Sequence, residues 1–339
     1  MAELRLDPIQ RRWVVTGKRP SLPAALDSGG ECPFCPGHER FTPASIYEKK
    51  GADGRWEIRV FPDRSPLFRI EGGLDRAGEG MFDRMNALGA HEILVATRRH
   101  GVTLAQLTIE EVARIIEVYR DRILDLKRDH RFRYVCLFKV QGRSGPTSQE
   151  HGYSQILATP VVPGAVEAEF RWSQFHFHRK ERCIFCDILQ QERESSLRVV
   201  DQTSDFTSLC PYAARFPYEL WILPNEHSSS FEQDLAAAGR PASLAGILKT
   251  SLQRIERISQ HLRMVIHTEP NLEAKRPRED WWTTIREDYH WHIEMVPELE
   301  SEPYYLVPEG FYFNPISAEE AAVVLRALEP EPAVVPSVE

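Results

Sequence analysis

The chain has 339 residues, and the usual size of about 150 residues per domain predicts two domains with separate cores. Its formal net charge is −8, from 42 basic and 50 acidic residues, and without a basic tail this excludes broad electrostatic binding to nucleic acid. The first residues lack the apolar core of a signal peptide, and no stretch approaches the ~20 apolar residues of a membrane span. We therefore expect a soluble, cytoplasmic protein with no membrane partner.

The first half of the chain alternates predicted strands with one long helix. Runs typical of strands occupy residues 13–15, 56–61, 91–95, 134–138 and 156–158. Between the third and fourth runs, Thr108 and Glu111 form a capping-box pattern that opens a long amphipathic helix. A C-x-x-C pair follows the first run, and a polar loop with a histidine precedes the last one.

From about residue 180 the same order of features returns, which indicates an internal duplication with a period of about half the chain. The second copy has a C-x-x-C pair, a strand followed by a histidine, a long helix and a histidine-containing strand, at Cys183 and Cys186, residues 220–223, His227, residues 242–262 and residues 290–294. A capping box at Ser317 opens a last helix. We predict two similar domains at residues 1–170 and 171–330, followed by a flexible, proline-rich tail at residues 331–339.

Each half carries two cysteines and two histidines in matching order. The first set is Cys32, Cys35, His100 and His151, and the second is Cys183, Cys186, His227 and His290. Thiolate and imidazole in groups of four suit tetrahedral zinc, and a closed four-ligand site is structural. The alternative is that the six cysteines are free core residues and that the histidines are near them only by chance. Two C-x-x-C pairs with histidines in matching order favour metal over that alternative. The lack of a secretion signal argues against disulfides.

His290 and His292 lie two residues apart in a strand pattern, so both side chains point to the same face. If His290 binds metal, His292 is free to act as a nucleophile. A histidine that attacks phosphorus forms a phosphoramidate, which divides one displacement into two easier ones. The alternative readings are that both histidines are ligands, or that His292 packs in a polar network.

The sequence has no Walker-type loop and no G-x-G-x-x-G segment after a strand, so the usual phosphate cradles are missing. Near the N-terminus, four arginines give a local positive charge suited to phosphate: Arg5, Arg11, Arg12 and Arg19. A solvated surface is the alternative for most of them.

Taken together, these segments resemble the galactose-1-phosphate uridylyltransferase family, the nucleotidyl-transferring branch of the histidine-triad superfamily. The resemblance runs nearly the whole chain and is carried by ELRLDPIQRRWVV, CPFCPGHE, VFPDRSP, HEILV, EHGYSQILATPVVP, CIFCDIL, RFPYELWILPNEH, YHWHIEM and GFYFNPISAEEAAVVLR. It implies an α+β fold of two tandem histidine-triad-like domains, each an antiparallel sheet with a long helix, assembled as a homodimer.

The resemblance also implies an activity and its cofactors. It points to a role in carbohydrate metabolism, galactose metabolism in particular, with a nucleoside monophosphate group moved between a nucleotide sugar and a sugar 1-phosphate or phosphate. It implies zinc at the two Cys/His sets. Iron with a glutamate ligand is the family's alternative at the second site, although the Cys183 and Cys186 pair favours zinc.

The family typically carries H-P-H-S-Q or H-P-H-G-Q in the first domain, where the first histidine binds metal, the second is the nucleophile and the glutamine contacts phosphate. In this sequence His151 takes the metal position, Tyr153 the nucleophile position and Gln155 the glutamine position. Besides Gln155, the residues predicted to contact substrate are Arg5, Asp63, Ser148 and Asn271.

Tyr153 cannot form a uridylyl-histidine intermediate, and a phenol, with a pKa of about 10, needs strong activation to attack. Three hypotheses follow. The first is a nucleotidyltransferase whose chemistry lies at His292 or around Tyr153 and Gln155. The second is a catalytically degenerate, zinc-stabilised nucleotide-binding protein, and the third is a zinc-stabilised scaffold without a ligand.

Overall fold

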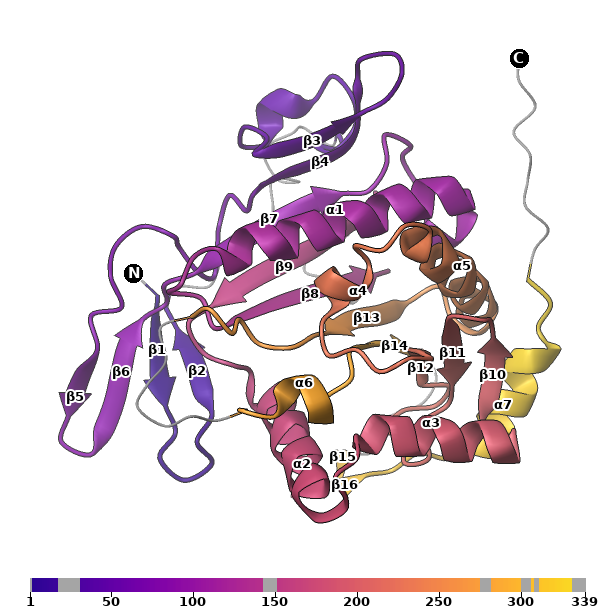
Figure 1. The fold of residues 1–339 in the computed structure, drawn as a ribbon. Helices are drawn as coiled ribbons and strands as arrows, with labels where there is room; N and C mark the ends of the chain where they lie inside the picture. Colours follow the sequence, from indigo (N-terminus) through magenta and orange to yellow (C-terminus); the bar gives the residue numbers. More distant parts are fainter. Residues whose placement is uncertain are drawn as a thin grey trace.

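The centre of the fold is a ten-stranded sheet in which every neighbouring pair of strands is antiparallel (Figure 1). The structure is a computed structural model that describes residues 2–17, 31–142, 151–274, 282–299, 306–307 and 311–330. The strand order is β10-β11-β12-β14-β13-β8-β9-β7-β4-β3. The predicted α+β class with antiparallel sheets and long helices is confirmed.

Each half of the chain contributes five neighbouring strands and one long helix to this sheet. In the first half these are β3 (Tyr47–Lys50), β4 (Trp56–Pro62), β7 (Ala90–Val95), α1 (Ile109–Lys127), β8 (Tyr134–Gln141) and β9 (Tyr153–Thr159). In the second half they are β10 (Val199–Gln202), β11 (Phe206–Leu209), β12 (Leu220–Pro224), α5 (Arg240–Ile258), β13 (Leu262–His267) and β14 (His292–Pro297). From either edge inward the order is the same, and the halves meet where β8 pairs with β13.

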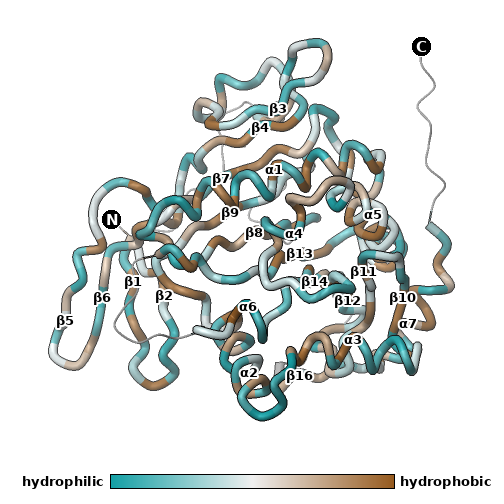
Figure 2. The backbone as a smooth tube through the Cα atoms, viewed as in Figure 1, coloured by the Kyte–Doolittle hydropathy of each residue, from teal (hydrophilic) through white to brown (hydrophobic). Residues whose placement is uncertain are grey.

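The two long helices cover one face of the sheet. α1 starts where its sequence predicts, because Thr108 accepts a hydrogen bond from the Glu111 backbone and the Glu111 carboxylate accepts one from the Thr108 backbone. The apolar sides of α1 and α5 share one large core with the strands beneath them. Figure 2 shows this pattern as alternating colours along α1 and mostly apolar colours along β7, β8 and β9.

The opposite face of the second half is covered by three helices: α2 (Gly164–Lys180), α3 (Ile184–Ser195) and α6 (Ile285–Asp288). They bury a second apolar cluster against β8, β11 and β12, with Phe170 and Tyr289 near its centre. The remaining helices are α4 (Phe231–Asp234), α7 (Ala318–Ala327) and the 3-10 turns η1 (Glu39–Phe41) and η2 (Leu104–Gln106).

A small four-stranded sheet lies beside the end of β9 (Figure 1). It contains β1 (Glu3–Leu6), β2 (Trp13–Thr16), β5 (Ala77–Glu79) and β6 (Phe82–Asn86), and a separate hairpin is formed by β15 (Leu306–Val307) and β16 (Phe311–Tyr312). The predicted boundary after residue 170 falls within α2 and stays a prediction, and the tail at 331–339 lies outside the described residues. Among the described helices, none has the length and apolarity needed to cross a membrane.

Candidate metal centres and the face around Tyr153

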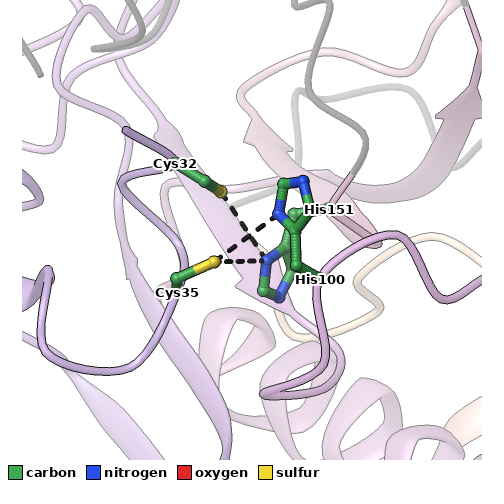
Figure 3. A group of neighbouring side chains, drawn as sticks. All are labelled: Cys32, Cys35, His100 and His151. Atoms are coloured by element: carbon green, nitrogen blue, oxygen red, sulfur yellow. Dashed lines mark hydrogen bonds between the residues drawn. The ribbon is translucent and has the colours of Figure 1, made fainter. Parts of the chain in front are cut away.

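The four ligands predicted for the first metal site come together although they span more than a hundred residues. Cys35 Sγ lies 3.5 Å from His100 Nδ1 and 3.7 Å from His151 Nδ1, and Cys32 Sγ lies 3.7 Å from His151 Nδ1. All four ligand atoms lie within 4.8 Å of one another. Figure 3 shows the two thiols facing the two imidazoles across a small gap.

These distances fit a tetrahedral zinc ion. With Zn–S near 2.3 Å and Zn–N near 2.0 Å, tetrahedral angles place sulfur and nitrogen about 3.5 Å apart. The observed sulfur–nitrogen separations of 3.5 and 3.7 Å lie close to that value. The donor set and its spacing therefore suit structural zinc in the first half, and the metal's presence stays a prediction.

The second predicted set assembles in the same way. Cys186 Sγ lies 3.4 Å from His227 Nδ1 and 3.7 Å from His290 Nδ1, and Cys183 completes the group. Cys183 caps the start of α3, whereas His227 follows β12 and His290 precedes β14. A metal here would fasten α3 to two central strands.

Backbone carbonyls orient three of the four histidines. The Nε2 atoms of His151, His227 and His290 lie 2.6, 2.8 and 3.0 Å from the carbonyl oxygens of Thr97, Arg286 and Pro224. Since a carbonyl only accepts, each Nε2 carries the proton and each Nδ1 lone pair faces the cysteines. Fixed tautomers of this kind are the usual outer support of a metal site.

Tyr153 opens β9, two residues after His151. Its ring packs edge-on against Phe34 at 5.5 Å and belongs to an apolar cluster, so that only 5% of the residue is exposed. Lys139, which is buried on β8, donates a hydrogen bond to the Tyr153 carbonyl oxygen at 3.0 Å. The pKa of the Lys139 amine is lowered to about 8, mainly because the amine is buried.

Gln155 lies two residues further along β9, on the same face as Tyr153. Its amide oxygen lies 3.0 Å from His91 Nε2, and the Leu67 backbone N–H donates to His91 Nδ1 at 3.3 Å. Nδ1 is therefore the unprotonated nitrogen, and Nε2–H donates to Gln155 Oε1. This arrangement fixes which way the amide points and leaves the Gln155 N–H groups as donors for another partner.

Asp63 belongs to the same buried group. Its carboxylate accepts a hydrogen bond from the Ser65 backbone, and its other oxygen lies 3.5 Å from His91 Nε2. The structure thus brings Asp63 and Gln155 together through His91, a residue that the sequence assigned only to a strand.

His292 lies in a different group from His290, although the two are neighbours in the sequence. Its ring stacks on His267 at 4.7 Å and contacts Trp221 and Phe185, and only 1% of the residue is exposed. Burial, together with the charge on His267, lowers the pKa of His292 to about 4. Within the described residues its Nε2 has no hydrogen-bond partner.

Two carboxylates complete this third group. His267 Nδ1 lies 3.0 Å from Glu169 on α2, and its Nε2 lies 3.6 Å from Glu294 on β14. Burial alone lowers the pKa of His267, but the carboxylates of Glu169 and Glu294 raise it to about 9. The ligand atoms of Glu169, His267, His292 and Glu294 all lie within 4.8 Å of one another. Imidazole with carboxylate suits iron as well as zinc. These four residues are therefore a candidate for the glutamate-containing iron site that the resemblance offered as an alternative.

Two predicted substrate residues lie elsewhere, and a third cannot be placed. Arg5 is on β1 in the small sheet, where it pairs with Glu3. Asn271 is buried and holds a loop, because its amide N–H groups donate to the carbonyl oxygens of Lys127 and Phe132. Ser148 lies outside the described residues.

The fold and the two Cys/His groups together define a duplicated α+β protein with one candidate metal centre in each half. Residues 9–163 match the family profile described as "Galactose-1-phosphate uridyl transferase, N-terminal domain". The chain is 29% identical to ADP-glucose phosphorylase of Arabidopsis thaliana, over 96% of this chain and 92% of the relative. It is 26% identical to galactose-1-phosphate uridylyltransferase of Thermotoga maritima, over 98% of this chain and all of the relative.

Solved structures agree with the sequence matches. The crystal structure of ADP-glucose phosphorylase from A. thaliana with bound ADP-glucose superimposes with a TM-score of 0.74 at 27% identity, covering 97% of this chain and all of the other. A uridylyltransferase structure gives a TM-score of 0.78 at 23% identity over 96% and 97% of the chains, which shows the shared fold. The chain is thus similar to galactose-1-phosphate uridylyltransferase and to ADP-glucose phosphorylase over nearly its whole length.

Proposed function

We propose that the chain is a nucleotidyltransferase that moves a nucleoside monophosphate group from a nucleotide sugar to phosphate or a sugar 1-phosphate. The observation that carries the proposal is Gln155 on β9, whose amide oxygen is held by His91 so that its N–H groups are left as donors. Charged phosphate oxygens are strong acceptors for such donors. The names of the relatives support both acceptor types, since one is a phosphorylase and the other a uridylyltransferase.

A direct displacement suits the residues present. An oxygen of the acceptor phosphate attacks the α-phosphorus of the nucleotide sugar, and the bond to the sugar 1-phosphate oxygen breaks with its electron pair. With phosphate as acceptor, the products are a nucleoside diphosphate and a sugar 1-phosphate. Gln155 holds a phosphate oxygen, and Asp63 and His91 position Gln155. Cys32, Cys35, His100 and His151 would hold a structural zinc ion, which would support the start of β9.

Tyr153 and His292 are weaker candidates for the attacking group. We infer that Tyr153 stands at the family's nucleophile position, but its ring packs in an apolar cluster against Phe34 and only 5% of the residue is exposed, which limits the access of a nucleotide. His292 is neutral but enclosed by His267, Trp221 and Phe185, so a nucleotide reaches it only after those rings move.

The test is a reaction of the purified protein with phosphate and ADP-glucose or UDP-glucose labelled at the α-phosphorus. We expect labelled nucleoside diphosphate and glucose 1-phosphate, no stable label on the protein, and at least a tenfold loss of rate in Gln155→Leu. Acid-labile, base-stable label that His292→Ala removes would place the chemistry at His292. An acid-stable label that Tyr153→Phe removes would place it at Tyr153.

The second candidate is a nucleotide-sugar-binding protein without turnover, and the burial of Tyr153 favours it. Calorimetric binding of ADP-glucose or UDP-glucose, with no product for any acceptor, would select this candidate over the enzyme.

We also propose zinc at both Cys/His groups and a homodimer in the cytoplasm, as the resemblance implies. Light scattering on the purified protein gives the assembly state, and a monomer at micromolar concentration would contradict the dimer.

A further inference from the structure

A cavity of about 520 Å³ is lined by none of the residues of the two Cys/His groups and not by Gln155. It opens between the small sheet and the segment where β9 leads into α2, the region near the arrowhead of β9 in Figure 1. Its walls come from the hairpin of β1 and β2, the hairpin of β5 and β6, residues 160–162 and Trp282. A volume of this size accommodates a small organic ligand.

Guanidinium groups dominate the charge of this cavity. The lining contains four arginines against two carboxylates, namely Arg11, Arg76, Arg84 and Arg133 against Asp83 and Glu167. Arg84 also pairs with Glu3 outside the lining, at 3.3 Å. Across the part of the chain that the structure describes, Arg11 and Arg76 form no ion pair. A surplus of positive charge in a chain of net charge −8 is a local feature suited to an anion.

The lining of the cavity also includes apolar side chains and indole rings. Leu6, Met85 and Val162 are part of the lining, as are Trp13 and Trp282. Arg133 lies 5.7 Å from the centre of the Trp282 ring, so a guanidinium and an aromatic ring already pair on one wall. A ligand that fits both parts has a planar or apolar body and a charged group.

The backbone of Trp282 supports a binding role. Its φ is +69°, a conformation that bulky L residues rarely adopt. The ring is held in place by an edge-on contact with Phe170 at 5.3 Å. Strain that is kept at a position by surrounding packing occurs preferentially at ligand sites.

We propose that this cavity is a second binding site that takes a nucleoside phosphate, with the base against the indole rings and the phosphates against Arg11 and Arg76. The site shares no lining residue with the face around Gln155 and does not depend on the proposed reaction. The second site gives a role to Arg11, one of the four N-terminal arginines noted in the sequence. Arg11 takes no part in the proposed reaction.

The experiment is calorimetric titration of the full chain with ADP. We expect Arg76→Glu and Arg11→Glu each to weaken one class of ADP sites at least tenfold, and Trp13→Leu to weaken the same class. Arg257→Glu, the same charge change at an exposed position of α5, is the matched control and leaves ADP affinity unchanged. Inorganic phosphate is expected to bind the site at least tenfold more weakly than ADP.

The variant Gln155→Leu distinguishes ADP binding at the second site from ADP binding at the site of the proposed reaction. The second site predicts that ADP binding sensitive to Arg76→Glu persists in Gln155→Leu. If Gln155→Leu alone removes all ADP binding, or if the arginine variants bind ADP like the wild type, the second site is overturned while the proposed function stands. If phosphate binds as tightly as ADP, the base-binding part is overturned.

Discussion

At the scale of single residues, the proposed reaction can be tested at Tyr153. Tyr153→His places an imidazole beside the His91-oriented Gln155. We expect an acid-labile, base-stable nucleotidyl group on residue 153 and a rate at least tenfold above that of the wild type, because imidazole is nucleophilic near neutral pH whereas phenol is not. The loss of ring contacts with Phe34 costs about 1–2 kcal/mol of stability.

Mass spectrometry of the protein quenched after mixing with labelled nucleotide sugar detects this intermediate. Tyr153→Phe is the matched control, since it keeps the ring and removes only the hydroxyl; we expect it to retain the wild-type rate. A Tyr153→His protein that folds and carries no label would mean that residue 153 does not face the α-phosphate.

Lys139 makes the stability of the fold depend on pH. Its folded pKa is about 8 and its unfolded value 10.5, so below pH 8 both states are charged and burial of the charge destabilises the native state. As pH rises from 8 to 10.5 the folded state loses its proton first, the unfolded state binds more protons, and this penalty disappears. The difference corresponds to about 3 kcal/mol.

We therefore expect Lys139→Met to be more stable than the wild type at pH 7, with the advantage shrinking towards pH 10.5. Urea unfolding of both proteins at several pH values measures it, and the other titrating groups cancel in the comparison. A constant difference across this range would show that the amine is solvated in the native state.

The grouping of the candidate metal ligands could be predicted from the sequence, because the C-x-x-C spacing and the repeated order of histidines are local signals. The partners of His292 could not be predicted from the sequence. Glu169 comes from α2, a segment for which no helix was predicted from the sequence, and His267 meets His292 only through the pairing of β13 with β14. His91 was likewise one residue of a strand until the register placed it beside Gln155.

At the scale of elements, a buried ion pair fastens α1 to the sheet. Arg122 donates to both carboxylate oxygens of Glu92 on β7, at 2.9 and 2.6 Å, and both side chains are buried. Removal of one partner leaves the other charge without its main counter-ion. We expect Arg122→Ala to lower the free energy of unfolding by about 3–5 kcal/mol.

The double variant Glu92→Met with Arg122→Leu is expected to recover most of that loss, since apolar residues of similar volume avoid the cost of desolvating charge. Urea unfolding of the two single variants and the double variant gives the coupling between the residues. Purely additive losses would contradict a specific pair.

Metal is expected to hold several elements together at each Cys/His group. We expect two zinc ions per chain by elemental analysis, and one in Cys35→Ser or in Cys186→Ser. Because the second group joins α3, the end of β12 and the start of β14, Cys186→Ser is expected to lower the free energy of unfolding by about 3 kcal/mol or more. A Cys186→Ser protein with wild-type zinc content and stability would contradict a metal at this group.

Most central elements could be predicted because their patterns are local. The strand-like runs became β2, β4, β7, β8, β9 and β12, and α1 and α7 begin at their predicted capping boxes. The small sheet was only partly foreseen. β5 and β6 are short, mostly exposed strands without a clear apolar alternation, and they form because β1 offers an edge to β6.

At the scale of the whole molecule, the pairing of β8 with β13 turns two five-stranded halves into one sheet. Met264 pairs with Lys139 and Ile266 with Leu137, and the core beneath α1 and α5 is continuous across this junction. We expect unfolding in urea to be a single transition, with tryptophan fluorescence and circular dichroism changing together.

Val265→Pro removes an N–H from the central ladder and is expected to separate the halves into two transitions, or to prevent folding. The exposed Arg263→Ala on the same strand is the control and keeps one transition. Two transitions in the wild type would show that the halves are energetically independent.

The junction between the halves also bears on how the sequences of the two repeats can diverge. Equivalent strands of two repeats meet there in antiparallel fashion, which is the contact that two identical half-length subunits make around a two-fold axis. In such a pair every substitution appears twice. A covalent fusion lifts that symmetry, so the residues that open the equivalent strands β9 and β14 are able to differ, as Tyr153 and His292 do.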